Sequence, residues 1–232
     1  MYTLRKLKEN RPKKVLLVTP TSFGEVGLTK WLSPHLGIER LAGYVKKHGH
    51  YAETYDTNFY NSTKTGPSLM DKLKSNRWDV IGFSVYDESI VNDIVNINVA
   101  SRESPESLII AGGTGAQYDY QTILDKSSAR IVVIGEGEKP LLKLLQGVPI
   151  EDIPGIVLKN YNMPLNEKEF IDATNSIEYA YIPYEQYWDY YIDQYQKTGK
   201  EITKELSQQI HTIRIYSRNY CPMKCKFCSA NN

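Results

Sequence analysis

The sequence predicts an α/β fold of the flavodoxin or Rossmann kind with a parallel five-stranded sheet. Short runs rich in β-branched residues alternate with segments of helical period between residues 14 and 146, which is the pattern of parallel strands joined by crossover helices. The first run, Val15 to Thr19, shows no polar alternation, as expected of a central strand buried on both faces. The length of 232 residues allows such a domain together with a substantial extension.

Each expected strand follows from a short apolar run. The five runs are residues 15–19, 51–55, 79–85, 107–111 and 130–134. Residues 36–47 have an amphipathic helical pattern that ends at His48-Gly49, where glycine suits a left-handed cap. The segments between the later strands are long enough for helices. In folds of this kind, ligands bind beyond the carboxyl ends of the strands.

The carboxyl ends of the expected strands are rich in small and turn-forming residues. They are Thr19-Pro20-Thr21-Ser22, Ser84, Gly112-Gly113-Thr114-Gly115 and Gly135-Glu136-Gly137-Glu138. Glycine there lets the backbone approach a ligand closely, although ordinary βα turns use the same residues. Four such turns on one edge favour a ligand site. The sequence has no G-x-G-x-x-G after the first strand and no G-x-x-x-x-G-K-[ST], so it indicates neither of these nucleotide-binding motifs.

The composition is that of an ordinary globular protein. Hydrophobic residues make up 41% and charged residues 24% of the chain, which argues against disorder, collagen and a disulfide scaffold. With 28 Lys plus Arg against 27 Asp plus Glu, no overall charge would draw the chain to DNA or to an anionic membrane. Residues 1–14 show no signal peptide, and no apolar run approaches the ~20 residues that span a bilayer. We therefore expect a cytoplasmic protein without nucleic-acid or membrane partners.

Residues 149–205 do not continue the alternation of strand and helix segments, and we predict that they form an aromatic-rich linker. Tyr184, Tyr187, Trp188 and Tyr191 are spaced three and four residues apart, so in a helix they share one face. Stacking on nucleic acid is disfavoured by the acidic residues nearby, and packing between two domains fits the burial habits of Tyr and Trp. This face would bury a large area if it docks on the first domain, and from the part left uncovered we expect either self-association or local mobility.

The three cysteines of the chain lie close together near its end. Cys221, Cys225 and Cys228 have the spacing C-x3-C-x2-C, on a loop that follows a strand-like run at 212–216. Three thiolates at this spacing can hold three corners of a 4Fe-4S cluster and leave the fourth iron open. A structural zinc would need His211 as its fourth ligand, at an unusual distance along the chain. Inert buried thiols fit poorly with the two lysines of the loop.

The cysteine loop resembles that of the radical S-adenosylmethionine (radical SAM) enzymes. The resemblance rests on the spacing, on Pro222 after the first cysteine and on Phe227 before the third. Upstream, further motifs resemble the cobalamin-binding domain that precedes the radical domain in one large subgroup. These motifs are Pro34 to Ile38 with Leu41-Ala42, Gly49-His50, Asp56, Ile81 to Ser84, Gly112-Gly113 and residues 135–138. Together they cover nearly the whole chain.

This resemblance implies the cofactors and their sites. Cys221, Cys225 and Cys228 would ligate a 4Fe-4S cluster whose open iron chelates S-adenosylmethionine, with Phe227 beside the adenine. An external electron donor would reduce the cluster, and cleavage of S-adenosylmethionine would release a 5′-deoxyadenosyl radical. Cobalamin would lie over the carboxyl edge of the first domain. The residues that would line it are Thr19, Pro20, Ser84, Tyr86, Gly112, Gly113, Gly135 and Glu136.

The cobalt ligation departs from that of many cobalamin domains. The D-x-H-x-x-G motif that supplies an axial histidine is absent after the first strand. His35 is the histidine nearest to that loop, and we expect it to be solvated or satisfied within the protein core rather than bound to cobalt. The resemblance thus implies cobalamin without a histidine ligand.

The expected domain plan has three parts. They are a cobalamin-binding domain over residues 1–148, the linker over 149–205, and the start of a radical SAM (β/α) barrel over 206–232. Such a barrel needs ~200 residues, so we expect the chain to be the front part of an enzyme and to be inactive alone.

The function that the resemblance implies is that of a cobalamin-dependent radical SAM enzyme of methyl-transferring type. Its catalytic residues and its substrate, a small molecule or a peptide, are not identified by the sequence. A non-catalytic corrinoid-binding module with a vestigial cluster loop is one alternative. A flavodoxin-like domain that binds no corrin is another.

Overall fold

A seven-stranded sheet forms the centre of this computed structural model, which describes residues 7, 10–21, 32–162 and 176–215. The strands are β1 (Lys14–Val18), β2 (Tyr51–Tyr55), β3 (Val80–Ser84), β4 (Leu108–Gly112), β5 (Ile131–Val133), β6 (Ile156–Leu158) and β7 (Tyr161–Asn162). Their order is β2-β1-β3-β4-β5-β6-β7, and β1 to β5 are parallel. The order of these five strands is that of a flavodoxin-like fold. The predicted fold class and its parallel five-stranded sheet are confirmed.

Strands β6 and β7 extend the sheet beyond residue 148, where the sequence analysis ended it. β6 pairs antiparallel with β5, with Val132 opposite Val157, and β7 pairs antiparallel with β6. β6 has only three residues and follows Pro149 and Pro154, so it shows no periodicity of its own. Its pairing depends on β5, and the sequence interpretation of this segment as linker missed it.

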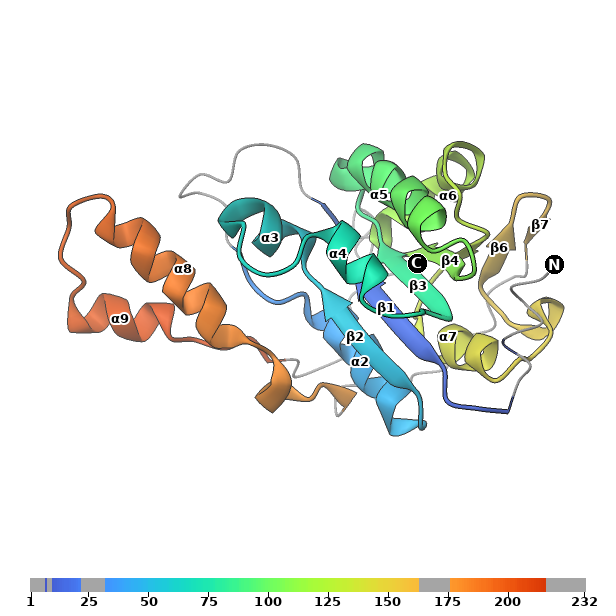
Figure 1. The fold of residues 1–232 in the computed structure, drawn as a ribbon, viewed down its shortest axis with the longest axis horizontal. Coiled ribbons are helices and arrows are strands. Elements are labelled where there is room, and N and C mark those ends of the chain that lie inside the picture. Colours follow the sequence, from blue (N-terminus) through green and yellow to red (C-terminus); the bar gives the residue numbers. More distant parts are fainter. Residues whose placement is uncertain (1–6, 8–9, 22–31, 163–175, 216–232) are drawn as a thin grey trace, which may run out of the picture.

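Helices cover both faces of the sheet (Figure 1). One face carries α2 (Leu36–Lys47) and α7 (Glu138–Leu145), whose apolar residues pack in one cluster with Val15 and Leu17 of β1. The other face carries α4 (Leu69–Lys74), α5 (Ile90–Glu103) and α6 (Thr114–Lys126), which pack with Leu16 and Val18. Side chains alternate along β1, and both sets are buried. The prediction of a central strand buried on both faces is therefore confirmed.

Shorter elements lie at the strand ends. α3 (Thr57–Thr63) follows β2, and 3-10 turns occur at η1 (Asp87–Ser89), η2 (Ile150–Asp152) and η4 (Tyr179–Tyr181). The C-terminal helices α8 (Tyr184–Gln196) and α9 (Lys204–Ile210) project together from one side of the α/β body (Figure 1). Residues 212–215 have no regular structure, so the strand-like run expected at 212–216 is wrong over its described part. Across the described ranges, no helix has the length and apolarity needed to cross a membrane.

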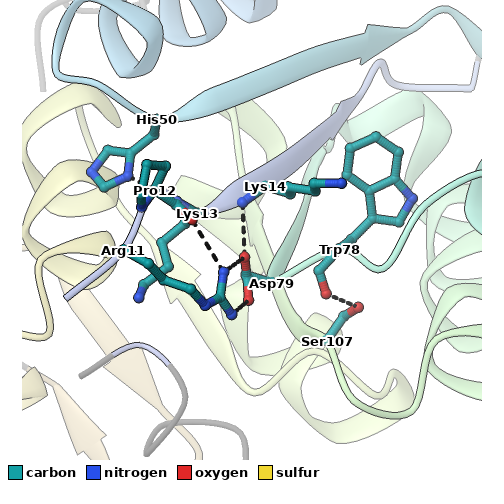
Figure 2. A network of polar contacts seen from close by, with 8 residues as sticks. All are labelled: Arg11, Pro12, Lys13, Lys14, His50, Trp78, Asp79 and Ser107. Atoms are coloured by element: carbon teal, nitrogen blue, oxygen red, sulfur yellow. Dashed lines mark hydrogen bonds and ion pairs between the residues drawn. The ribbon is translucent and has the colours of Figure 1, made fainter. Parts of the chain in front are cut away.

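The amino edge of the sheet is tied together by Asp79, which directly precedes β3 (Figure 2). Its carboxylate accepts hydrogen bonds from Arg11 Nη1 at 2.9 Å and Nη2 at 2.6 Å, and from the backbone N–H of Lys14 at 2.8 Å. Burial would raise the pKa of Asp79, but these donors hold it below its usual value. Nearby, Ser107 Oγ donates to the Trp78 carbonyl at 2.7 Å. These contacts fix the strand starts opposite the candidate site.

Candidate functional site

The residues expected to line the cobalamin site gather at the carboxyl edge of the sheet. All of them end, or closely follow, one of the parallel strands β1, β3, β4 and β5. They are Thr19, Pro20, Ser84, Tyr86, Gly112, Gly113, Gly135 and Glu136. Carboxyl ends of parallel strands meet at the same edge, so the topology brings these residues together. Which of them contact a ligand stays a prediction.

Gly113 is required by packing within the protein. It precedes α6 with φ +96°, and a Cβ atom there would lie 2.8 Å from both Ser84 Oγ and the Val85 carbonyl oxygen. Gly115 is similarly constrained, because its Cβ would lie 2.5 Å from the carbonyl carbon of Tyr86. The start of α6 therefore abuts the backbone that follows β3. Close approach of α6 to the end of β3 is thus one reason for glycine at position 113, and the predicted approach of a ligand there stays a prediction.

A shallow pocket of about 350 Å³ lies where β3 and β4 end. Its lining residues are Tyr86, Asp87, Glu88 and Thr114. Of these four, Tyr86 is a predicted cobalamin contact and Thr114 belongs to one of the predicted strand-end turns, whereas Asp87 and Glu88 were not predicted. Asp87 and Glu88 belong to a 3-10 turn and Thr114 is the first residue of α6, so none carries a periodic signal. Only their position after a strand end could have indicated them.

His35 joins the start of α2 to the loop after β3. As the N-cap residue, it accepts a hydrogen bond at Nδ1 from the backbone N–H of Ile38 at 3.3 Å. Nε2 therefore carries the proton and lies 2.6 Å from the Tyr86 hydroxyl. Burial lowers the pKa of His35, which favours this neutral form. Both ring nitrogens have partners within the protein, as expected for a histidine satisfied by the fold.

Glu136 is held by an ion-pair cluster with α2. Its carboxylate lies 2.5 Å from Nη2 of Arg40, and Nε of Arg40 lies 2.5 Å from Oε1 of Glu138. The side chain of Glu138 is 1% exposed; burial raises its pKa, and the Arg40 charge opposes that rise. The cluster fastens the turn that begins at Gly135 to α2. The side chain of Glu136 is half exposed beside this cluster, and its predicted place in the cobalamin site stays a prediction.

Asp93 of α5 holds the loop that follows β1. Its Oδ1 accepts from the Thr21 backbone N–H at 2.8 Å, and its Oδ2 accepts from Ser89 Oγ at 2.6 Å. The side chain is almost fully buried, and this burial raises the pKa of Asp93 to about 6. Asp93 on α5 therefore connects the loop after β1 with the loop after β3.

A known protein family matches the part of the chain that forms this edge of the sheet. Residues 30–145, which are half of the chain, match the B12 binding domain. The chain belongs to the B12-binding domain family. The matched region of this B12-binding domain runs from just before α2 to the end of α7, so it includes the turns after β3, β4 and β5. Thr19 and Pro20 lie before it.

Known proteins of similar sequence and structure include methyltransferases. The chain is 21% identical to cytidylyl-2-hydroxyethylphosphonate methyltransferase of Streptomyces wedmorensis over 98% of its own length and 49% of that protein. It thus spans about half the length of this relative.

Two solved structures share the fold of the chain. The radical S-adenosylmethionine methyltransferase TsrM from Kitasatospora setae, with cobalamin and a 4Fe-4S cluster bound, has a TM-score of 0.55 and 18% identity over 70% of this chain and 30% of that one. OxsB, a cobalamin-dependent S-adenosylmethionine radical enzyme with aqua-cobalamin bound, has a TM-score of 0.55 and 16% identity over 72% and 24%. The B12-binding family confirms the cobalamin-binding part of the resemblance inferred from the sequence, and these two structures have the same fold.

The predicted cluster ligands Cys221, Cys225 and Cys228, and Phe227 beside them, lie outside the described residues. Among the residues that are described, no group of three or more His, Cys, Asp or Glu side chains could hold a metal. His211, the alternative zinc ligand, ends α9 and donates from Nδ1 to the Ser207 carbonyl at 2.7 Å. The cluster site therefore stays a prediction from the cysteine spacing.

Proposed function

We propose that this chain binds cobalamin at the carboxyl edge of its B12-binding domain and a 4Fe-4S cluster at Cys221, Cys225 and Cys228. In this proposal it is the cobalamin-binding part of a radical SAM methyltransferase. The observation that carries the proposal is the presence of a B12-binding domain and a C-x3-C-x2-C loop in one chain. The similarity to a methyltransferase over 98% of the chain supports it.

The carboxyl edge fits a large, flat ligand with amide side chains. The turns of this edge are rich in small residues, and its pocket is lined by Tyr86, Asp87, Glu88 and Thr114. The edge therefore offers the Thr114 hydroxyl and the backbone groups of the glycine turns. Such groups donate and accept hydrogen bonds without net charge. Bound cobalamin would supply methyl-transfer chemistry at cobalt. The chain's own residues would hold the macrocycle and orient it over the strand ends.

Titration with hydroxocobalamin tests the first half of the proposal. We expect the purified chain to bind about one equivalent, detected by absorbance after gel filtration. Thr114→Trp places a large side chain at the pocket rim, where Thr114 is exposed, and should abolish binding. Gln121→Trp, at an exposed position further along α6, is the matched control. A wild-type chain that retains no corrin would contradict the proposal.

Anaerobic reconstitution with iron and sulfide tests the second half. We expect about four irons per chain and a brown absorbance near ~400 nm, because three thiolates hold a cubane as one unit. Cys225→Ala should abolish both signals. Stoichiometric zinc without iron in anaerobically purified protein would exclude the cluster. Cobalamin binding without a cluster would leave the alternative of a non-catalytic corrinoid-binding module.

A further inference from the structure

Helix α8 reaches the carboxyl edge of the sheet through Tyr187. The Tyr187 side chain is buried, and its hydroxyl donates a hydrogen bond to Asp56 Oδ2 at 2.6 Å. Its ring packs on Phe59 of α3 with ring centroids 4.8 Å apart. Burial and the adjacent Asp56 carboxylate raise the pKa of Tyr187, so the hydroxyl keeps its proton and acts as the donor. These contacts dock α8 on the α/β body, and the expected self-association through its aromatic face stays a prediction.

Asp56 lies between α8 and the loop that follows β1. Its Oδ1 accepts from the backbone N–H groups of Asn58 at 2.9 Å and Phe59 at 3.0 Å, which caps α3. The same oxygen lies 3.4 Å from Thr19 Oγ1. One carboxylate thus contacts Tyr187 with one oxygen, and the start of α3 and Thr19 with the other.

The start of α3 in turn holds the backbone of the loop. Thr57 Oγ1 lies 3.2 Å from the Thr19 carbonyl oxygen and 3.1 Å from that of Pro20. Asn58 Nδ2 donates to the Pro20 carbonyl at 2.9 Å. Thr57 is buried, so its contacts with the loop are shielded from water. Thr19 and Pro20 are the residues expected to line the cobalamin edge at β1.

We propose that Tyr187 is a positioning residue of the cobalamin site. Through Asp56 and the start of α3, it holds the loop Thr19-Pro20 in the conformation that receives the corrin. The inference rests on the proposed cobalamin binding and deepens it. It gives a role in the site to a helix that the sequence analysis assigned to a linker, 131 residues away from Asp56 along the chain.

The affinity of the full chain for hydroxocobalamin tests this inference. Tyr187→Phe removes only the hydroxyl and leaves the ring packed on Phe59. We expect the dissociation constant to rise about tenfold, which corresponds to about 1.4 kcal/mol. Tyr190→Phe is the matched control, because the Tyr190 hydroxyl makes no hydrogen bond within the part of the chain that the structure describes. An affinity of Tyr187→Phe within twofold of this control would overturn the inference.

A second variant tests whether the effect passes through the start of α3. Thr57→Val removes the hydroxyl that contacts Thr19 and Pro20 while keeping the side-chain shape. Each single variant raises the dissociation constant by some factor. If Tyr187 and Thr57 act on the same loop, the factor for the double variant should be smaller than the product of the two single factors. Losses that simply multiply would show that the two residues act separately, and would contradict the proposed route.

Hydrogen exchange without cobalamin separates this inference from the proposed function. In Tyr187→Phe, the backbone amides of Asn58 and Phe59 should exchange faster than in wild type, while those of β4 remain unchanged. Unchanged exchange at α3 would overturn the inference even if cobalamin binds. A wild-type chain that binds no cobalamin would defeat the proposed function itself, and the assigned role of Tyr187 with it.

Discussion

Gly113 packs against Ser84 so closely that a Cβ atom on the glycine would lie 2.8 Å from the serine Oγ. A bulky side chain at this position, as in Gly113→Leu, would fill space over the strand ends. In the structure the added side chain would meet the end of β3, because the Val85 backbone is as near as Ser84. The φ of +96° at Gly113 adds backbone strain for any residue with a side chain. A loss of cobalamin binding in Gly113→Leu would therefore indicate that the substitution disturbs the carboxyl edge of the sheet.

Gly113→Ala should lower the free energy of unfolding by about 2–4 kcal/mol. The reasons are the positive φ of Gly113, which only glycine adopts without strain, and the clash with the end of β3. Gly112→Ala is the control and should cost less, because its Cβ would first meet the Val133 carbonyl oxygen at 3.4 Å. Urea denaturation measures both values. Equal losses in the two variants would argue against the tight contact between α6 and β3.

His35→Ala should lower stability without changing the corrin spectrum. It removes the N-cap acceptor of α2 and the contact with Tyr86, for an expected loss of about 0.5–2 kcal/mol. His35→Asn keeps an N-cap acceptor and should recover part of this loss. Because both imidazole nitrogens are bonded within the protein, we expect the cobalt absorption bands of bound cobalamin to remain unchanged. Shifted bands in His35→Ala would identify the histidine as a cobalt ligand.

Asp93 should make stability depend on pH. Burial raises the pKa of Asp93 from 3.8 to about 6, so the folded protein holds this proton more tightly than the unfolded chain does. The stabilisation from protonated Asp93 is complete below about pH 4 and is lost as the pH rises through 6. At pH 7 and above, the buried carboxylate then costs up to about 3 kcal/mol relative to the acid form.

The variant Asp93→Asn isolates this contribution. It keeps an acceptor for the Thr21 N–H but does not ionise. The unfolding free energy of the variant minus that of wild type should grow between pH 4 and 7 and then level off, as measured by urea denaturation across this range. Asp189→Asn, at an exposed position on α8, is the control. A flat difference for Asp93→Asn would mean that the carboxyl group is not perturbed.

Arg40 and Glu138 should behave as a buried pair. Arg40→Met leaves the Glu138 carboxylate buried without its partner, and we expect a loss of about 3–5 kcal/mol in unfolding free energy. Adding Glu138→Gln to the same chain should recover part of that loss. Glu136→Gln should cost less than about 1 kcal/mol, because its side chain is half exposed. Chemical denaturation at pH 7 of wild type, Arg40→Met, Glu138→Gln, the double variant and Glu136→Gln measures these differences. Losses of Arg40→Met and Glu138→Gln that simply add in the double variant would contradict the pairing.

Local patterns in the sequence determined the parallel strands and the edge at which a ligand would bind. The apolar run at β1, the turns after β3, β4 and β5, and the helical pattern of α2 each depend on residues close together in the chain, so each could be predicted. The cysteine spacing likewise predicts a cluster, within residues 221–228, from the chain alone.

Only the tertiary structure decided which side chains meet at that edge. Arg40 binds Glu136 across 96 residues, and Tyr187 binds Asp56 across 131, so neither contact leaves a local pattern. The same reason applies to β6, whose three residues become a strand by pairing with β5. The turn that contains Gly113 has the composition of any βα turn. Position 113 requires glycine because α6 and β3 approach each other there. Long-range packing determines these features, because their partners come together only when the chain folds.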